Sequence, residues 1–349
     1  MPTPISSLVR QTKPVADKLN VLSFCFDEKH ELLLTGTGSN VVAISVPGLW
    51  YRWNNDLMTK PTNYTMFEFS PNADLLTNLP CCYDYDIIVG YQRPSHYDSG
   101  KKVAEMLQIP LVMITNEFPV SVSDAFNISV YGDMAGYSNI YGNDSLKAFW
   151  NVRGDAKTIR PGVNIDKFKP TLPFEKRHGK LVTVANNFMQ RDEETNFRKW
   201  KAIISGEEFF LSGHNPGLPS EFVSFSSLHK VYQDARIYLN TITGGVFPSE
   251  IIEAMASGCV VISLDFVGAR DFIKHGENGF IFKTEQEAKK FAKQINNDKA
   301  LFDRISENAR NFAVENCNLT TQSSMLKDEL VRVVAANREK VYEKSKLVG

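Results

Sequence analysis

The chain has 349 residues, of which 43% are hydrophobic and 23% charged, and its formal net charge is −1 at pH 7. This length exceeds what one hydrophobic core usually serves, so we expect two domains of ordinary soluble composition. A charge near zero gives no global field that favours nucleic acid or an anionic membrane. Neither a spanning apolar run nor a signal peptide is evident. The five cysteines form no CxxC or other metal spacing, as expected of reduced thiols in a cytoplasmic protein.

The first half of the chain alternates apolar, β-branched runs with helical segments. The expected strands are 20–26, 41–46, 85–90 and 109–115, and the expected helix is 101–107. This alternation favours a parallel sheet that is covered on both faces. Residues 159–170 are rich in Pro, Gly and Asn, which predicts a loop.

A second α/β series begins at Lys180. The expected strands are 181–185, 209–212, 237–240 and 260–264, with helices at 227–235, 249–257, 268–273, 285–295, 301–316 and 320–342. Residues 275–282 are interpreted as a tight turn into a further strand. Ligands of such sheets bind beyond the carboxyl ends of the strands. We therefore expect a cleft to be lined by the junctions 185–191, 213–217, 225–228 and 243–250.

The segment 247–263 is the most informative part of the sequence. A short polar turn leads into an amphipathic helix, and Gly258 ends this helix before a buried strand. A helix N-terminus offers unpaired N–H groups and a positive dipole end, which suit a phosphate. One turn further in, the carboxylate of Glu253 can accept hydrogen bonds from sugar hydroxyls. Phosphate and ribose together predict a nucleotide or a nucleotide-sugar.

This segment resembles the donor-site signature of retaining GT-B glycosyltransferases, family 4 in particular. The linker 159–170 and the turn 275–282 resemble further family segments in the right order. The resemblance implies an α/β protein with two Rossmann-like, doubly wound domains that face a central cleft. It implies an acceptor-side domain over residues 1–168 and a nucleotide-sugar donor domain over residues 169–324. A C-terminal helix at about 325–349 is expected to pack back on the first domain.

The resemblance also implies roles for the residues of the donor site. Glu253 takes the ribose-binding role of the family's second Glu. The backbone N–H groups that hold phosphate would be those near Ser249, Glu250 and Ile251. Gly244 and Gly245 would let the backbone approach a diphosphate closely, since Gly lacks Cβ. The family carries its first Glu at the position of Gly245, and this departure leaves the identity of the sugar open.

Three other loops complete the expected donor site. Arg191 stands where the family has a Lys and would anchor the diphosphate, because Arg binds phosphate bidentately. Asn186 stands where the family has an Arg. The remaining donor-site candidates are Gly213 and His214 in a glycine loop, and Phe225 and Leu228 in the loop that holds the nucleobase.

The catalytic candidates lie in the first domain. The family often has a sugar-contacting His after a mid-domain strand, and the matching place here holds Asn116 and Glu117. Glu117 would orient an acceptor hydroxyl, or it simply caps a helix. His96 is a further cleft candidate.

The resemblance implies a retaining hexosyl- or pentosyltransferase that uses a nucleotide-diphosphate sugar, a UDP-sugar in our expectation, as co-substrate. It implies no cofactor and no obligatory metal. The acceptor stays open among DNA (hydroxymethylated cytosine, as for phage-type enzymes), glycan, lipid and protein. A nucleotide-sugar-binding protein without transferase activity is the alternative that Gly245 and Asn186 suggest. The location is cytoplasmic, in the host if phage-encoded, and we favour an unusual donor sugar over lost activity.

Overall fold

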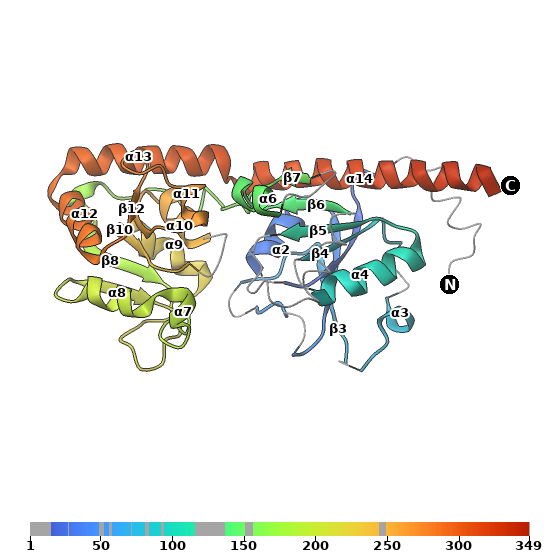
Figure 1. The fold of residues 1–349 in the computed structure, drawn as a ribbon, viewed down its shortest axis with the longest axis horizontal. Helices are drawn as coiled ribbons and strands as arrows, with labels where there is room; N and C mark the ends of the chain where they lie inside the picture. The colour runs from blue at the N-terminus through green and yellow to red at the C-terminus, as the bar shows by residue number, and fades with distance from the viewer. Residues whose placement is uncertain are drawn as a thin grey trace.

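The computed structural model describes residues 15–26, 28–48, 52–55, 58–70, 72–80, 84–91, 94–115, 137–150, 156–243 and 249–348. These residues form two separate sheets of parallel strands with helices packed against them (Figure 1). We call the part built on the first sheet the first unit and the part built on the second sheet the second unit. The predicted α/β class with two doubly wound parallel sheets is confirmed.

The first sheet has seven strands in the order β3-β2-β1-β4-β5-β6-β7. Its strands are β1 (Asn20–Phe24), β2 (Asn40–Ser45), β3 (Tyr64–Glu68), β4 (Ile87–Tyr91), β5 (Leu111–Thr115), β6 (Ser138–Tyr141) and β7 (Ala156–Thr158). Its helices are α2 (Glu28–Thr35), α3 (Leu75–Asn78), α4 (Pro94–Leu107) and α6 (Asp144–Trp150). The central strands are buried and apolar, and the sequence predicted them. The strands β3, β6 and β7 and the helix α2 are short and poorly patterned, and the sequence did not reveal them.

The second sheet has five strands in the order β12-β11-β10-β8-β9. Its strands are β8 (His178–Val184), β9 (Phe209–Ser212), β10 (Ala235–Asn240), β11 (Val260–Leu264) and β12 (Phe280–Phe282). Its helices are η1 (Phe174–Lys176), α7 (Asp192–Thr195), α8 (Phe197–Ile204), α9 (Phe225–Gln233), α10 (Ser249–Ala256), α11 (Val267–Arg270), α12 (Glu285–Asn297) and α13 (Lys299–Asn316). Every strand predicted for this sheet is present, within three residues at each end.

The last helix returns to the first unit. Helices α13 and α14 (Leu319–Val348) lie end to end along one side of the molecule, α13 over the second unit and α14 over the first (Figure 1). Leu326, Leu330 and Val334 of α14 are buried in the same core cluster as Leu33 and Leu34 of α2. No helix within the described ranges is both long and apolar enough to cross a membrane.

The chain therefore crosses between the units twice. The outward crossing is residues 159–173, between β7 and η1, and the return crossing is residues 317–318, between α13 and α14. The two crossings are paired. Val163 on the outward crossing forms a parallel bridge with Asn318 on the return crossing. The Val163 N–H donates to the Cys317 carbonyl at 2.7 Å, and the Leu319 N–H donates to the Val163 carbonyl at 3.0 Å. A Cβ on Gly162 would lie 2.3 Å from the Leu319 Cα, so only glycine permits this approach.

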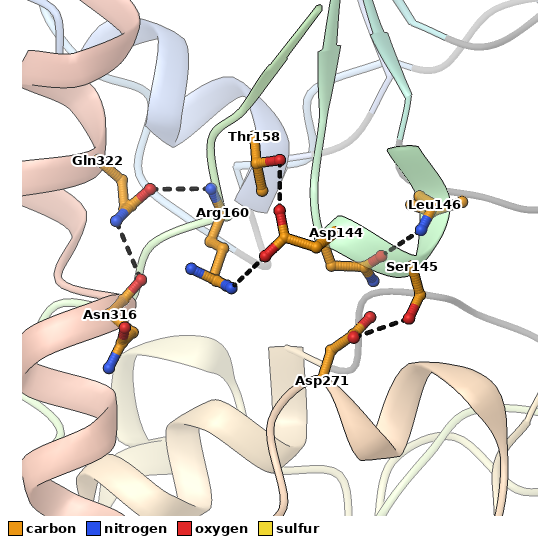
Figure 2. Close-up of polar contacts among 9 residues, drawn as sticks. Asp144, Ser145, Leu146, Thr158, Arg160, Asp271, Asn316 and Gln322 are labelled. Carbon is orange, nitrogen blue, oxygen red and sulfur yellow. Dashed lines mark hydrogen bonds and ion pairs between the residues drawn. The ribbon is translucent and has the colours of Figure 1, made fainter. Parts of the chain in front are cut away.

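Side-chain contacts join the units beside the crossings (Figure 2). The Ser145 hydroxyl of α6 donates to Asp271, just after α11 in the second unit, at 2.8 Å. Arg160 donates through its side chain to Asp144 at 3.2 Å and through its backbone N–H to Gln322 at 2.8 Å. These bonds tie α6, the outward crossing and α14 into one polar network.

Two arginines bind the carbonyl end of α10. Buried Arg177 donates to the carbonyls of Ser257 at 3.0 Å and Gly258 at 3.2 Å. Arg310 of α13 donates to the carbonyl of Ala256 at 2.8 Å and also to the carbonyl of Phe168 in the crossing. A cation at a helix C-terminus complements the helix dipole and satisfies carbonyls that lack partners. The C-terminal end of α10 is thereby fixed to the crossing.

Two loops at the carboxyl ends of β8 and β9 are held together closely. The Asn186 Oδ1 accepts a hydrogen bond from the His214 N–H at 2.7 Å, and the Asn187 N–H donates to the His214 carbonyl at 2.8 Å. Gly213 has a φ of +127°, and a Cβ there would lie 2.0 Å from the Ala185 carbonyl oxygen. The pairing of these loops requires glycine at this position.

We predict that Gly213→Ala lowers the free energy of unfolding by about 3 kcal/mol, because it adds an overlap with backbone to a disfavoured conformation. Gly206→Ala is the matched control, since Gly206 also has a positive φ, +81°, but a Cβ added there would have no atom within 4 Å. The control should cost only about 1–2 kcal/mol. Urea denaturation of both variants measures the difference, and equal costs would contradict the close approach of the two loops.

Candidate functional site

A cavity of about 670 Å³ lies between the two units. Its walls come from α2 of the first unit, the outward crossing, and the first turns of α9 and α10 in the second unit. The lining side chains with the most direct bearing on ligand binding are Lys29, Asn164, Lys167, Phe225, Ser249 and Glu253. Of the four junctions expected to line a cleft, 225–228 and 243–250 contribute residues to this cavity, whereas no residue of 185–191 or 213–217 lines it.

Glu253 of α10 is the buried carboxylate of this cavity. Its side chain is 4% exposed. The Oε1 atom lies 2.9 Å from the Lys29 Nζ, and the Oε2 atom accepts a hydrogen bond from the Tyr232 hydroxyl at 3.2 Å. A carboxylate so deeply buried needs such partners, because burial of an unpaired charge is costly. The helix geometry that the sequence predicted for Glu253 is present, one turn inside α10.

Lys29 of α2 crosses to this carboxylate from the opposite unit. Its Nζ also lies 2.8 Å from the Ser249 Oγ and 3.1 Å from the Glu250 Oε1. Burial lowers the pKa of Lys29, but the charges of Glu250 and Glu253 outweigh burial and hold the pKa above its usual range. The sequence did not single out Lys29. Its only local signal is its place at the start of the helix that follows β1, since ligands of parallel sheets bind beyond the carboxyl ends of the strands.

The two carboxylates on α10 respond differently to this lysine. Burial raises the pKa of Glu250, but the charge of Lys29 and several hydrogen bonds outweigh it, so the pKa falls. Burial also raises the pKa of Glu253, and there Lys29 does not fully compensate, so the pKa stays above its usual value. The two carboxylates also differ in exposure, since the Glu253 side chain is 4% exposed and that of Glu250 is 33% exposed.

Phe225 and Leu228, the expected nucleobase contacts, lie in the first turns of α9. Phe225 lines the cavity, and the Lys167 Nζ lies 4.4 Å from its ring centroid. Lys167 also donates to the Phe225 carbonyl at 3.0 Å. Burial lowers the pKa of Lys167, against the opposing charge of Glu253. Leu228 is 5% exposed and packs in the core behind Phe225, with Tyr232 and Ile251.

Arg191 lies outside the walls of this cavity. It precedes α7, and its guanidinium forms an ion pair with Glu194 while 49% of the side chain is exposed. The paired loops described above contain Asn186, Gly213 and His214. They lie, like Arg191, at the carboxyl end of the second sheet. The Asn186 side chain is engaged with the backbone of His214, so it holds the loop in place.

Of the phosphate-binding candidates, Ser249 and Glu250 line the cavity, whereas Ile251 is fully buried in the core beside it. His96 lies within α4, is 1% exposed and accepts a hydrogen bond from the Tyr91 N–H at 3.3 Å through its Nδ1. The candidates Asn116, Glu117, Gly244 and Gly245 lie outside the described residues.

The described ranges contain no group of three or more His, Cys, Asp or Glu side chains that could hold a metal ion. The carboxylates on the cavity wall are Glu28, Glu250 and Glu253. Glu28 accepts a hydrogen bond from the Asn54 N–H at 2.6 Å, and the other two are bound to Lys29. A reaction without a metal stays a prediction of the sequence.

Comparison with protein families finds that residues 164–312 match the model of glycosyl transferases group 1. The matched residues include the outward crossing from Asn164 onward, both paired loops, and helices α9 and α10. Among curated proteins, no sequence matches the chain.

Solved structures match over nearly the whole chain at low identity. Anabaena HepE in complex with UDP has a TM-score of 0.72 and 15% identity, covering 90% of this chain and 99% of that one. Sucrose-phosphate synthase from Thermosynechococcus elongatus has a TM-score of 0.70 and 16% identity, covering 91% and 100%. A glycosyltransferase from Rickettsia africae has a TM-score of 0.65 and 15% identity, covering 91% and 99%.

These likenesses establish the fold, which is that of GT-B glycosyltransferases. The family match is independent of them, because it rests on the sequence of residues 164–312 alone. Together the family match and the fold indicate that the chain is a glycosyltransferase.

Proposed function

We propose that this protein transfers a sugar from a UDP-sugar to an acceptor hydroxyl with retention of anomeric configuration. The observation that carries the proposal is the buried Glu253 carboxylate, which faces an interdomain cavity one turn inside α10. The matched family model and the UDP in the HepE structure support a nucleotide-sugar as the donor. Retention is supported by the resemblance of residues 247–263 to retaining enzymes.

In this proposal the nucleotide lies along the wall formed by α9 and α10. Ribose hydroxyls donate to Glu253, since a carboxylate offers several acceptor sites and the described residues occupy two of them, through Lys29 and Tyr232. The uracil ring lies beside Phe225, at the first turn of α9. The diphosphate lies at the N–H groups of the first turn of α10, where the helix dipole favours an anion.

The leaving diphosphate gains negative charge as the glycosidic bond to the donor sugar breaks. Donors and cations that are already in place stabilise that charge without reorganisation. Arg177 and Arg310 fix the carbonyl end of α10. The N–H groups at the opposite end of this helix, which faces the cavity, are therefore already in place when the charge develops. Arg191 would contribute after release from Glu194, to which it is bound on the surface.

We predict that Glu253→Gln raises the KM for UDP-glucose by about ten- to hundredfold, because the neutral amide accepts weaker hydrogen bonds than the carboxylate it replaces. Glu307→Gln, an exposed carboxylate on α13, is the matched control and should leave KM unchanged. The measurement is initial-rate kinetics of UDP release from UDP-glucose, with and without an acceptor sugar.

The same assay separates this proposal from its rival. A wild-type protein that binds UDP-glucose but neither transfers nor hydrolyses it would be a nucleotide-sugar-binding protein. Equal KM values for Glu253→Gln and wild type would show that Glu253 does not bind the donor. Inversion at the anomeric carbon of the product, read by proton NMR, would refute retention.

We predict that Arg191→Ala raises the KM for UDP-glucose by about tenfold, as expected for the loss of one charge-assisted contact to phosphate. Arg198→Ala is the matched control, because Arg198 is a neighbouring arginine, 92% exposed and paired with Asp192. Both variants are measured with the assay above. If the two variants behave alike, Arg191 is a surface residue and not a ligand of the diphosphate.

A further inference from the structure

Lys29 connects the two units through the wall of the cavity itself. Its ammonium lies 2.8 Å from the Ser249 hydroxyl, 3.1 Å from Glu250 and 2.9 Å from Glu253. An ammonium has three N–H donors, so these three contacts use all of them. The partners are all on the first five residues of α10, whereas Lys29 belongs to α2 of the first unit.

The position of Lys29 coincides with the proposed path of the donor. Its Nζ also lies 5.8 Å from the ring centroid of Phe225, between the expected nucleobase wall and the first turn of α10. A ribose hydroxyl that reaches the Glu253 Oε1 must approach the place where the Lys29 ammonium is bound. Lys29 is 30% exposed, so its side chain faces the cavity on one side.

The charges on the cavity wall show why a cation is needed there. The wall carries the carboxylates of Glu28, Glu250 and Glu253, and its lysines are Lys29 and Lys167. A diphosphate brings at least two further negative charges to this wall. Lys167 is held at the Phe225 end by its hydrogen bond to the backbone, so within the described part of the wall Lys29 is the lysine bonded to the first turn of α10.

We propose that Lys29 is a donor-binding residue that exchanges its bonds to Glu250 and Glu253 for the diphosphate of the bound nucleotide-sugar. This inference rests on the function proposed above. The exchange frees Glu253 to accept the ribose hydroxyls and places the cation on the group that becomes the leaving diphosphate. The diphosphate then joins α2 to α10 in place of the ion pair, so donor binding maintains the contact between the units.

The proposal distinguishes Lys29 from an ordinary interdomain ion pair. A structural ion pair would contribute to folding and would not discriminate between ligands that share a base and ribose. With a diphosphate as the ligand of Lys29, by contrast, loss of the lysine charge weakens the binding of UDP but does not weaken the binding of uridine, which has no diphosphate and competes with Lys29 for Glu253.

The experiment compares UDP and uridine by isothermal titration calorimetry with wild type, Lys29→Gln and Lys29→Arg. Glutamine still donates hydrogen bonds toward Glu253 but carries no charge, so thermal melting should report a folded variant. We expect Lys29→Gln to raise the Kd of UDP by about ten- to hundredfold and to leave the Kd of uridine equal or lower. Lys29→Arg should recover most of the loss. Lys102→Gln, which removes a lysine paired with Asp98 on α4, is the matched control.

Equal effects of Lys29→Gln on UDP and uridine, or no effect on either, would overturn the role of Lys29 while leaving the proposed function intact. A different result would contradict the proposed function, namely that the wild-type protein binds no nucleoside diphosphate. That result would refute both proposals together. If wild type prefers a different base, the same comparison is made between that nucleoside and its diphosphate.

Discussion

The site depends on how helix α10 is held at its carbonyl end. Arg177 and Arg310 bind the carbonyls of Ala256, Ser257 and Gly258, and the same arginines reach the crossing and the start of β10. A buried helix end without such partners would leave several carbonyls unsatisfied, which is costly. With that end fixed, the opposite end faces the cavity. The placement of Ser249, Glu250 and Glu253 follows from these contacts.

Among the described residues, three kinds of contact join the two units, each with a different consequence. The paired crossings at Val163 and Asn318 are backbone contacts, which fix the place where the units join. The bond from Ser145 to Asp271 is a side-chain contact next to the crossings. The contact of Lys29 with α10 lies in the cavity wall, among groups that a ligand would meet. A ligand in the cavity would therefore act on the third contact and leave the other two in place.

Two residues that depart from the pattern the sequence resembles have side chains bound to other groups of the protein. Asn186 replaces an arginine, and its side chain is committed to the backbone of the neighbouring loop. Arg191 replaces a lysine, and it is paired with Glu194 on the surface. Neither side chain lines the cavity, and the lysines on its wall are Lys29 and Lys167. Lys29 of the first unit lies against the N-terminal end of α10, where it can supply positive charge.

The sequence by itself determined the parts of this protein that local patterns encode. Buried β-branched runs predicted the central strands, and the polar turn, apolar face and terminal glycine predicted α10 with Glu253 one turn inside it. The short strands β3, β6 and β7 were missed because a few residues of mixed polarity carry little periodic signal.

Only the tertiary structure decided which distant groups share the cavity. The Lys29 Nζ lies 2.9 Å from the Glu253 Oε1, but the two residues belong to different units and no spacing along the chain links them. The same holds for Arg310, whose carbonyl partners belong to α10 and the crossing. Local sequence specifies the elements because hydrogen bonds within helices and apolar alternation act over a few residues. The charge balance of the site depends on long-range packing, which brings α2 to the end of α10.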